Sequence, residues 1–176
     1  NAKKALPSAC IPPLFAIFVE MNMSILDFAT IAFAITGIIA TYFPRVPAAV
    51  ASAFASMVTA HFASATPATE TLLFWAVAST IAAGIRYLHG GRRNGNGYVA
   101  TGTLAGTLLG YLISPTAASL ICGGAAGAIL AAIAYVRTPR GEKIDIHSRQ
   151  FADFVGSRAL PAIITCTMAA IALSSL

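Results

Sequence analysis

The chain has 176 residues, of which 57% are hydrophobic and only 10% are charged, and its mean hydropathy is +0.78. Soluble domains carry about 25% charged residues, so this composition excludes an ordinary water-soluble domain and predicts an all-α, polytopic membrane helical bundle. The formal net charge of +5 gathers in a few predicted loops, so it does not indicate a nucleic-acid partner.

Residues 1–24 are predicted to form an N-terminal arm ahead of the membrane domain. Lys3 and Lys4 precede an apolar run, as in a signal peptide, but three prolines make this run a poor straight helix. Asn1 is not a start residue, whereas Met21 could be one. Two interpretations stay open, a short membrane-associated arm and an extension foreign to the native protein.

Residues 25–176 are predicted to form a single membrane domain with about six spans, because six apolar stretches approach the roughly 17–25 residues that cross a bilayer. They cover residues 25–43, 48–63, 71–88, 98–113, 116–136 and 159–176. The second stretch is short, so its full crossing stays open. Residues 137–158 form the one long polar segment. We interpret it either as a solvated cytoplasmic loop or, over residues 144–155, as an amphipathic helix on the membrane surface.

Basic residues fall on one side of this predicted topology. Nine of the eleven Lys and Arg residues lie in or beside the loops that follow the first, third and fifth spans, and the other two loops have none. The positive-inside rule makes the basic side cytoplasmic, which places the C-terminus outside. Trp75, near the other end of the third span, is expected at the outer membrane interface.

Small residues recur at every fourth position in the fourth and fifth stretches, on either side of Ser114 and Pro115. They are Gly102, Gly106, Gly110, Gly123, Gly127 and Ala131. In a bilayer this spacing leaves a groove of bare backbone along a helix, so that a neighbour can approach closely. The pattern predicts a central glycine-zipper hairpin, packed either within the chain or between protomers. A conduit lined by glycine is the alternative.

Five arginines flank the same hairpin. They are Arg86, Arg92, Arg93, Arg137 and Arg140. Clusters of four to eight basic residues beside a span can bind anionic headgroups, so we consider contact with anionic membrane lipids, besides the simpler interpretation that these arginines set the topology.

No catalytic residue, metal site or cofactor motif is predicted. The three histidines fall on both sides of the predicted membrane, and no cysteine joins them at ligand spacing. No acidic residue lies in the middle of a span, where its cost would imply a function. Asp27 comes closest, and an acid at the start of a helix suits the macrodipole. We therefore expect a helix cap there and a bundle without buried charge.

The order of these parts resembles the bacterial membrane family known as domain of unknown function 456. The similarity covers residues 25–176. It rests on four motifs, namely the Pro44–Pro47 turn, the glycine-containing basic loop at 90–95, the glycine runs flanking Pro115 and the segment 154–158. Two positions depart from the family, since Ala48-Ala49 stand where it usually has glycine and Arg86 stands where it often has an acid. The resemblance implies a bacterial cytoplasmic membrane protein and brings no known activity.

The sequence therefore predicts a non-enzymatic integral membrane protein that acts in assembly through helix packing. It would work as a homo-oligomer or as a subunit of a larger membrane complex. One alternative is a small transporter or channel, such as the substrate-binding subunit of a vitamin-uptake system, although such subunits normally keep both termini inside. The other is a lipid-handling protein, which would need a lipid-sized cavity near the cytoplasmic side.

Overall fold

The computed structural model describes residues 24–43, 46–88, 95–139 and 144–176, and these form six helices and no strand. The helices are α2 (Ile25–Thr41), α3 (Val46–Ser64), α4 (Thr69–Leu88), α5 (Asn96–Ile113), α6 (Ala117–Val136) and α7 (Arg149–Ser174). The predicted all-α class is confirmed for this part of the chain. The predicted arm lies outside the described residues, except for Ser24.

Local sequence explains where several helices begin. The Ser24 hydroxyl accepts a hydrogen bond from the Asp27 backbone N–H at 3.1 Å, and the Asp27 carboxylate accepts one from the Ser24 N–H at 2.8 Å. This is a reciprocal capping box at the start of α2, so Asp27 caps the helix as predicted. Thr116 and Ser148 cap α6 and α7 through their side chains.

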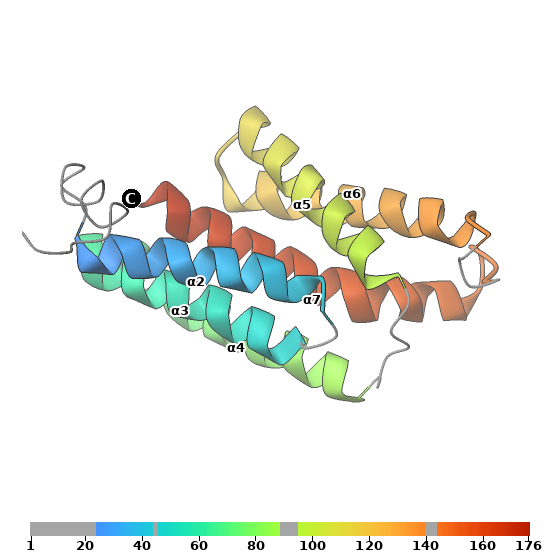
Figure 1. Cartoon of the computed structure of the whole chain (residues 1–176), viewed down its shortest axis with the longest axis horizontal. Coiled ribbons are helices and arrows are strands. Elements are labelled where there is room, and N and C mark those ends of the chain that lie inside the picture. The colour runs from blue at the N-terminus through green and yellow to red at the C-terminus, as the bar shows by residue number, and fades with distance from the viewer. Residues whose placement is uncertain (1–23, 44–45, 89–94, 140–143) are drawn as a thin grey trace, which may run out of the picture.

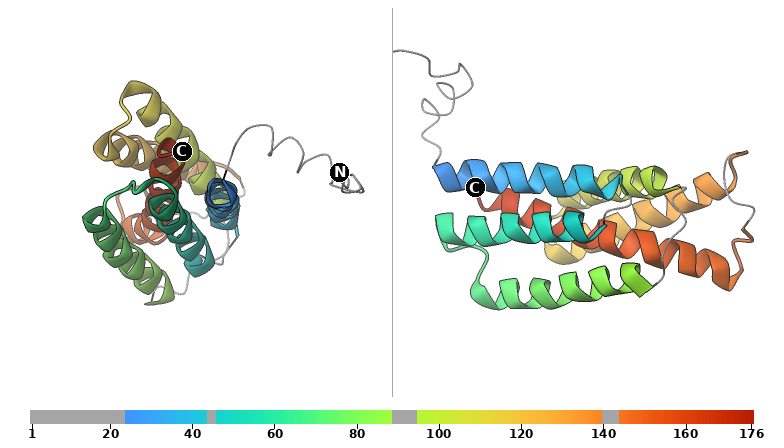
Figure 2. Two further views of the ribbon diagram at one scale, coloured as in Figure 1. Left: turned by 90° about the vertical axis from the view of Figure 1, so that its left-hand side faces the viewer. Right: turned by 60° about the horizontal axis from the view of Figure 1, so that its bottom comes forward.

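The C-terminal helix α7 lies at the centre of the molecule and contacts α2, α3, α4, α5 and α6. Helices α2, α3 and α4 lie along its C-terminal part, and the α5–α6 hairpin lies along its N-terminal part (Figures 1 and 2). One apolar cluster accordingly includes Met57, Trp75 and Met168, and a second includes Ala128 and Phe154. The two groups of helices are therefore offset along the long axis, and α7 joins them.

Helix α7 begins at Arg149 and has 26 residues, so it starts within the predicted polar segment over 137–158 and runs on through the predicted span over 159–176. Residues 149–158 are therefore neither a solvated loop nor a helix separate from the last one, and Phe154 there is buried in the cluster with Ala128. Where the membrane-crossing part of α7 begins stays a prediction. At 1.5 Å per residue, α7 is about 39 Å long and exceeds a hydrocarbon core of about 30 Å.

Two of the described helices, α6 and α7, are long and apolar enough to cross a membrane. Helix α2 and the segment Thr69–Ile85 of α4 are apolar but shorter. By length and composition alone, the structure therefore supports two spans and leaves the other four to a further argument.

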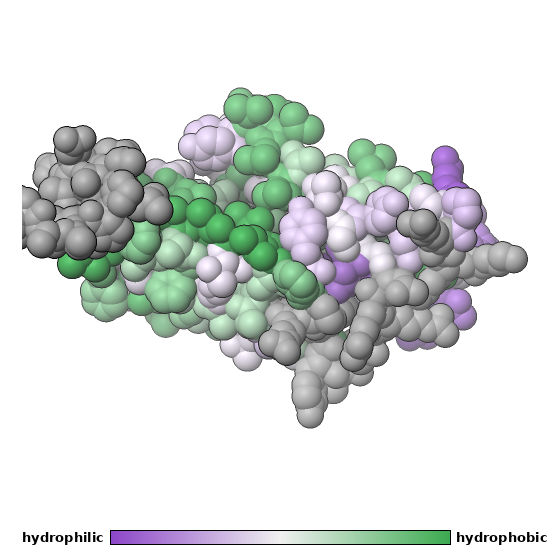
Figure 3. Space-filling model, viewed as in Figure 1, coloured by the Kyte–Doolittle hydropathy of each residue, from purple (hydrophilic) through white to green (hydrophobic). Residues whose placement is uncertain are grey.

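Hydroxyl groups share the interior with the apolar clusters, since Thr30, Thr103, Thr165, Thr167 and Ser56 are all 0% exposed. Large apolar side chains point outward from several helices. The most exposed on α4, α5 and α6 are Leu73, Phe74, Val77, Leu109, Leu112, Ile113 and Leu130. Figure 3 shows this apolar surface along α2 and around the hairpin tip, with hydrophilic residues gathered toward the end where α7 begins.

Trp75 does not face outward, as a residue of an interfacial aromatic belt would. This side chain is only 3% exposed and belongs to the core cluster with Met168. Its T-shaped contact with the exposed neighbour Phe74, at 5.4 Å between ring centroids, shows that Phe74 is the aromatic residue of this pair that faces outward.

Candidate functional site

The glycine runs of the hairpin face each other within the chain. A Cβ atom at Gly106 would collide with the carbonyl oxygen of Gly123, and one at Gly123 would collide with the carbonyl oxygen of Gly106. Gly102 lies in the same way against Gly127 and Ala131. Of the two packing modes left open by the sequence, the structure therefore has the one within the chain, and the glycine faces do not line an open conduit.

Near the hairpin tip, a hydroxyl group continues this contact. The Ser119 side chain donates a hydrogen bond to the Gly110 carbonyl oxygen at 2.7 Å, and a Cβ at Gly110 would meet the Ser119 carbonyl. Helices α5 and α6 thus touch backbone to backbone from Gly102 to Gly110, which makes the hairpin one closely packed unit.

Most of the predicted arginine cluster lies outside the described residues. This holds for Arg92, Arg93 and Arg140 and for the side chain of Arg86. Arg137 is exposed at the C-terminal end of α6, where its backbone N–H donates to the Ile133 carbonyl at 3.2 Å. Contact of these arginines with anionic lipid therefore stays a prediction.

Arg158 is a buried charged residue. The sequence pattern predicts it at the end of a polar loop, but it is only 7% exposed. Its Nε donates to the Asn96 side-chain oxygen at 3.1 Å and its Nη1 donates to the Phe154 carbonyl at 3.4 Å. The guanidinium carbon also lies 4.1 Å from the centroid of the Phe154 ring. The expectation of a bundle without buried charge is therefore wrong.

A chain of aromatic rings begins at the Phe154 ring beneath this guanidinium. We call Tyr98, Tyr135, Phe154 and Arg158 the arginine–aromatic cluster. The Phe154 ring stacks on Tyr135 with 5.8 Å between centroids, and Tyr135 contacts Tyr98 at 5.2 Å. Cation–π contacts of this kind strengthen as the cation loses water. The cluster connects the start of α5, the end of α6 and the N-terminal part of α7.

Gly95 permits this packing in two ways. Its φ of +89° lies in the left-handed region that side chains other than glycine rarely adopt. A Cβ there would also lie 2.8 Å from Tyr135 Cε1 and 3.0 Å from Phe154 Cζ. A glycine at the end of a polar loop, just before Asn96, was a signal in the sequence for a tight approach, but it does not reveal the partner.

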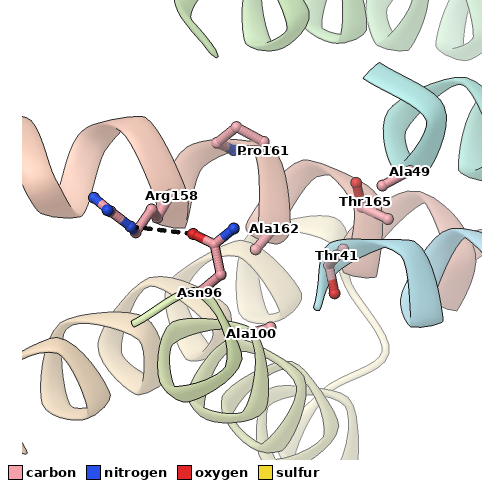
Figure 4. Close-up of a pocket in the computed structure, with 8 residues that line it drawn as sticks. All are labelled: Thr41, Ala49, Asn96, Ala100, Arg158, Pro161, Ala162 and Thr165. Carbon is pink, nitrogen blue, oxygen red and sulfur yellow. Dashed lines mark hydrogen bonds between the residues drawn. The ribbon is translucent and has the colours of Figure 1, made fainter. Parts of the chain in front are cut away.

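A small pocket lies beside the Arg158–Asn96 hydrogen bond, at the junction of α2, α3, α5 and α7 (Figure 4). It is lined by Thr41, Ala49, Asn96, Ala100, Arg158, Pro161, Ala162 and Thr165. The space open to the centre of a water molecule is about 10 Å³, which is room for about one water molecule. This pocket is too small for a lipid headgroup.

No protein-family model, curated protein or solved structure matches the chain. The resemblance to domain of unknown function 456 therefore stays a prediction. Within the described ranges, no three His, Cys, Asp or Glu side chains come together in a way that could hold a metal ion.

Proposed function

We propose that the chain is an integral membrane protein and that all six described helices cross the bilayer. The observation that carries this proposal is the exposure of large apolar side chains on several helices. Leu112, Ile113 and Leu130 are 80%, 83% and 68% exposed, and burial of apolar surface is worth about 25 cal/mol per Å². Exposed apolar patches on several helices at once suit a lipid environment and are rare on soluble monomers.

Helix α5 is less apolar than α6 for a reason consistent with spanning. Helix α5 has 18 residues, hence a length of about 27 Å. Its mean hydropathy is lowered by residues such as Thr103, Gly106 and Thr107, which are buried between helices. Membrane helices use glycine and threonine at their contacts, because close backbone approach and interhelical hydrogen bonds replace the hydrophobic drive of water.

The proposed orientation places the basic ends inside and the C-terminus outside. Exposed Arg137 and Arg149 lie at the end of α6 and the start of α7, which is the end where hydrophilic residues gather (Figure 3). By the positive-inside rule this end faces the cytoplasm. The first residues of α7, up to about Ser157, then extend beyond the hydrocarbon core, in keeping with the length of that helix. The resemblance supports a bacterial cytoplasmic membrane.

We further propose a non-enzymatic role in membrane assembly, as a homo-oligomer or an accessory subunit. The glycine hairpin acts in this role as a rigid unit inside each protomer, because its small residues are buried against one another. Contact with another protein then uses the outward faces of the helices, where Phe74 on α4 and Leu130 on α6 are exposed.

One observation favours a second candidate, a small transporter or channel. An ionisable residue buried within a membrane bundle often marks a pathway for ions or substrate. Arg158, which is hydrogen-bonded to Asn96, is such a residue near the proposed cytoplasmic side. Reconstitution in sealed liposomes tests this candidate. A solute or ion flux that falls at least tenfold in Arg158→Leu would favour transport.

The assembly proposal is tested on protein extracted gently from native membranes. Resistance to alkaline carbonate, followed by a defined oligomer or a constant foreign subunit in native mass spectrometry, is the expected result. Release by carbonate would contradict the membrane proposal. A carbonate-resistant monomer that carries a reproducible small ligand would contradict the assembly proposal alone and favour transport or lipid handling.

A further inference from the structure

Helix α7 changes its packing partners close to Pro161. Before this proline, Phe154 and Ala159 belong to the apolar cluster of the hairpin. After it, Ile164 and Met168 belong to the apolar cluster of α3 and α4. Proline has no backbone N–H, and its ring crowds the carbonyl four residues earlier, so the hydrogen-bond ladder of α7 is interrupted here. The helix that joins the two groups is therefore weakest at the place where they meet.

Each group contains a pair of helices in close backbone contact. A Cβ at Gly37 of α2 would lie 3.0 Å from the Ala53 backbone nitrogen and 3.2 Å from the Ala49 carbonyl oxygen of α3. The hairpin is packed in the same way, because Gly106 and Gly123 meet backbone to backbone. Close-packed backbone cannot yield without separating the helices, so each pair behaves as a rigid body.

Contact between the two groups is slighter. Within the described ranges, α3 and α4 contact neither helix of the hairpin, and α2 contacts α5 but not α6. Where α2 meets α5, the hydroxyl groups of Tyr42 and Thr101 share an exposed hydrogen bond of 3.3 Å. Small side chains such as Ala49 and Ala100 line the pocket at the junction beside Pro161 (Figure 4). The groups therefore meet over a short, smooth surface.

We propose that Pro161 is a hinge and that the α5–α6 hairpin, with the N-terminal part of α7, rocks as one body against α2, α3 and α4. The Arg158–Asn96 hydrogen bond ties the start of α5 to α7 beside this hinge. The hairpin tip lies at the far end of α5, a helix about 27 Å long. In Figure 1 the hairpin is inclined to α2, and its tip stands apart from that helix.

The size of the motion follows from this lever. A rotation of about 15°, as in known rigid-body rearrangements, displaces the tip of a lever of about 27 Å by about 7 Å. Hinge motions of this kind occur in microseconds to milliseconds, so a frozen sample traps their whole range. The hinge is independent of the proposed role in assembly, because it depends only on contacts within one chain.

Distances between spin labels test the hinge in the full chain, reconstituted in lipid nanodiscs and frozen. In a variant whose native cysteines are replaced by alanine, one pair of labels is placed at Leu73 of α4 and Leu109 of α5, so that it joins the two groups. A control pair at Leu73 and Phe33 of α2 lies within one group. All three side chains point outward. The pair that joins the groups should give a distance distribution about 7 Å wider than that of the control pair.

The substitution Pro161→Ala supplies the missing N–H and should narrow this distribution to about the width of the control pair. Pro47→Ala is the matched control, because Pro47 stands in the first turn of α3, where its N–H would have no partner within the helix, and it should leave the distribution unchanged. Equal widths for the two label pairs in the parent protein would overturn the proposal. A wide distribution that persists in Pro161→Ala would overturn the hinge at this residue.

Discussion

The substitution Gly106→Ala tests the backbone contact between α5 and α6 directly. A Cβ at this position collides with the Gly123 carbonyl oxygen and lies 2.9 Å from the Gly123 carbonyl carbon and 3.0 Å from Gly127 Cα. Carbon atoms pack best at about 3.5–4.0 Å. All three obstacles are backbone atoms, so no side-chain rotation relieves them, and α5 and α6 must move apart.

The expected magnitude follows from two opposing terms. Overpacking a tight contact costs about 1–3 kcal/mol, and we expect about 3 kcal/mol because separating the helices also loosens the contacts of Gly102 and Gly110. Alanine returns up to about 1 kcal/mol of helix propensity. The net destabilisation is about 2 kcal/mol, which for a protein of this size lowers the melting temperature by about 4–8 °C.

Gly84→Ala in α4 is the matched control, because a Cβ there meets nothing within 4 Å. It should leave the melting temperature unchanged or raise it by up to about 4 °C. Both variants are measured in the same mild detergent by thermal unfolding. Equal melting temperatures for Gly106→Ala and Gly84→Ala would refute backbone contact between α5 and α6.

Substitutions at three further positions test the ends of the helices and the buried charge. Gly95→Ala should destabilise the protein by about 2 kcal/mol, because its φ is left-handed and the Tyr135 ring lies against it; the same thermal melt measures this. Arg158→Leu should lower the free energy of unfolding by about 1–3 kcal/mol, because it leaves the Asn96 oxygen without its donor. Arg158→Lys should recover only part of this loss, because lysine lacks the planar fork of arginine. Full stability of Arg158→Leu would contradict the buried contact. Asp27→Ala should lower the free energy of unfolding by about 1 kcal/mol through loss of the α2 cap. Asp27→Asn keeps an acceptor and should lower it less. A liposome flux abolished by Asp27→Asn would contradict a purely capping role.

Structural features that depend on residues close together in the sequence were predictable. The small residues of the hairpin repeat at every fourth position, and this spacing by itself places them on one helix face. Asp27 stands three residues after Ser24, which is the spacing of a capping box. The start of α5 near Asn96 and the end of α6 at Val136 also lie within two residues of the predicted bounds, because a glycine-rich loop and a polar segment flank them.

Structural features that depend on contacts between residues far apart in the sequence were not predictable. Arg158 looked like the end of a polar loop, but its partner Asn96 lies 62 positions earlier in the chain. Because Arg158 resembles a loop residue, the last helix is predicted to begin after it, whereas the helix begins at Arg149. Trp75 resembled an interface residue because it lies near a span end, yet its position in the core depends on packing with Met168.

The most direct test of the six-span proposal is the accessibility of the hairpin tip in intact cells. In a variant whose native cysteines are replaced by alanine, single cysteines are placed at Ser114, between α5 and α6, and at Thr138, after α6. We predict that a membrane-impermeant maleimide labels Ser114→Cys in intact cells and labels Thr138→Cys only after the membrane is opened. Labelling of both positions from the same side would contradict a hairpin that crosses the bilayer and, with it, the six-span account.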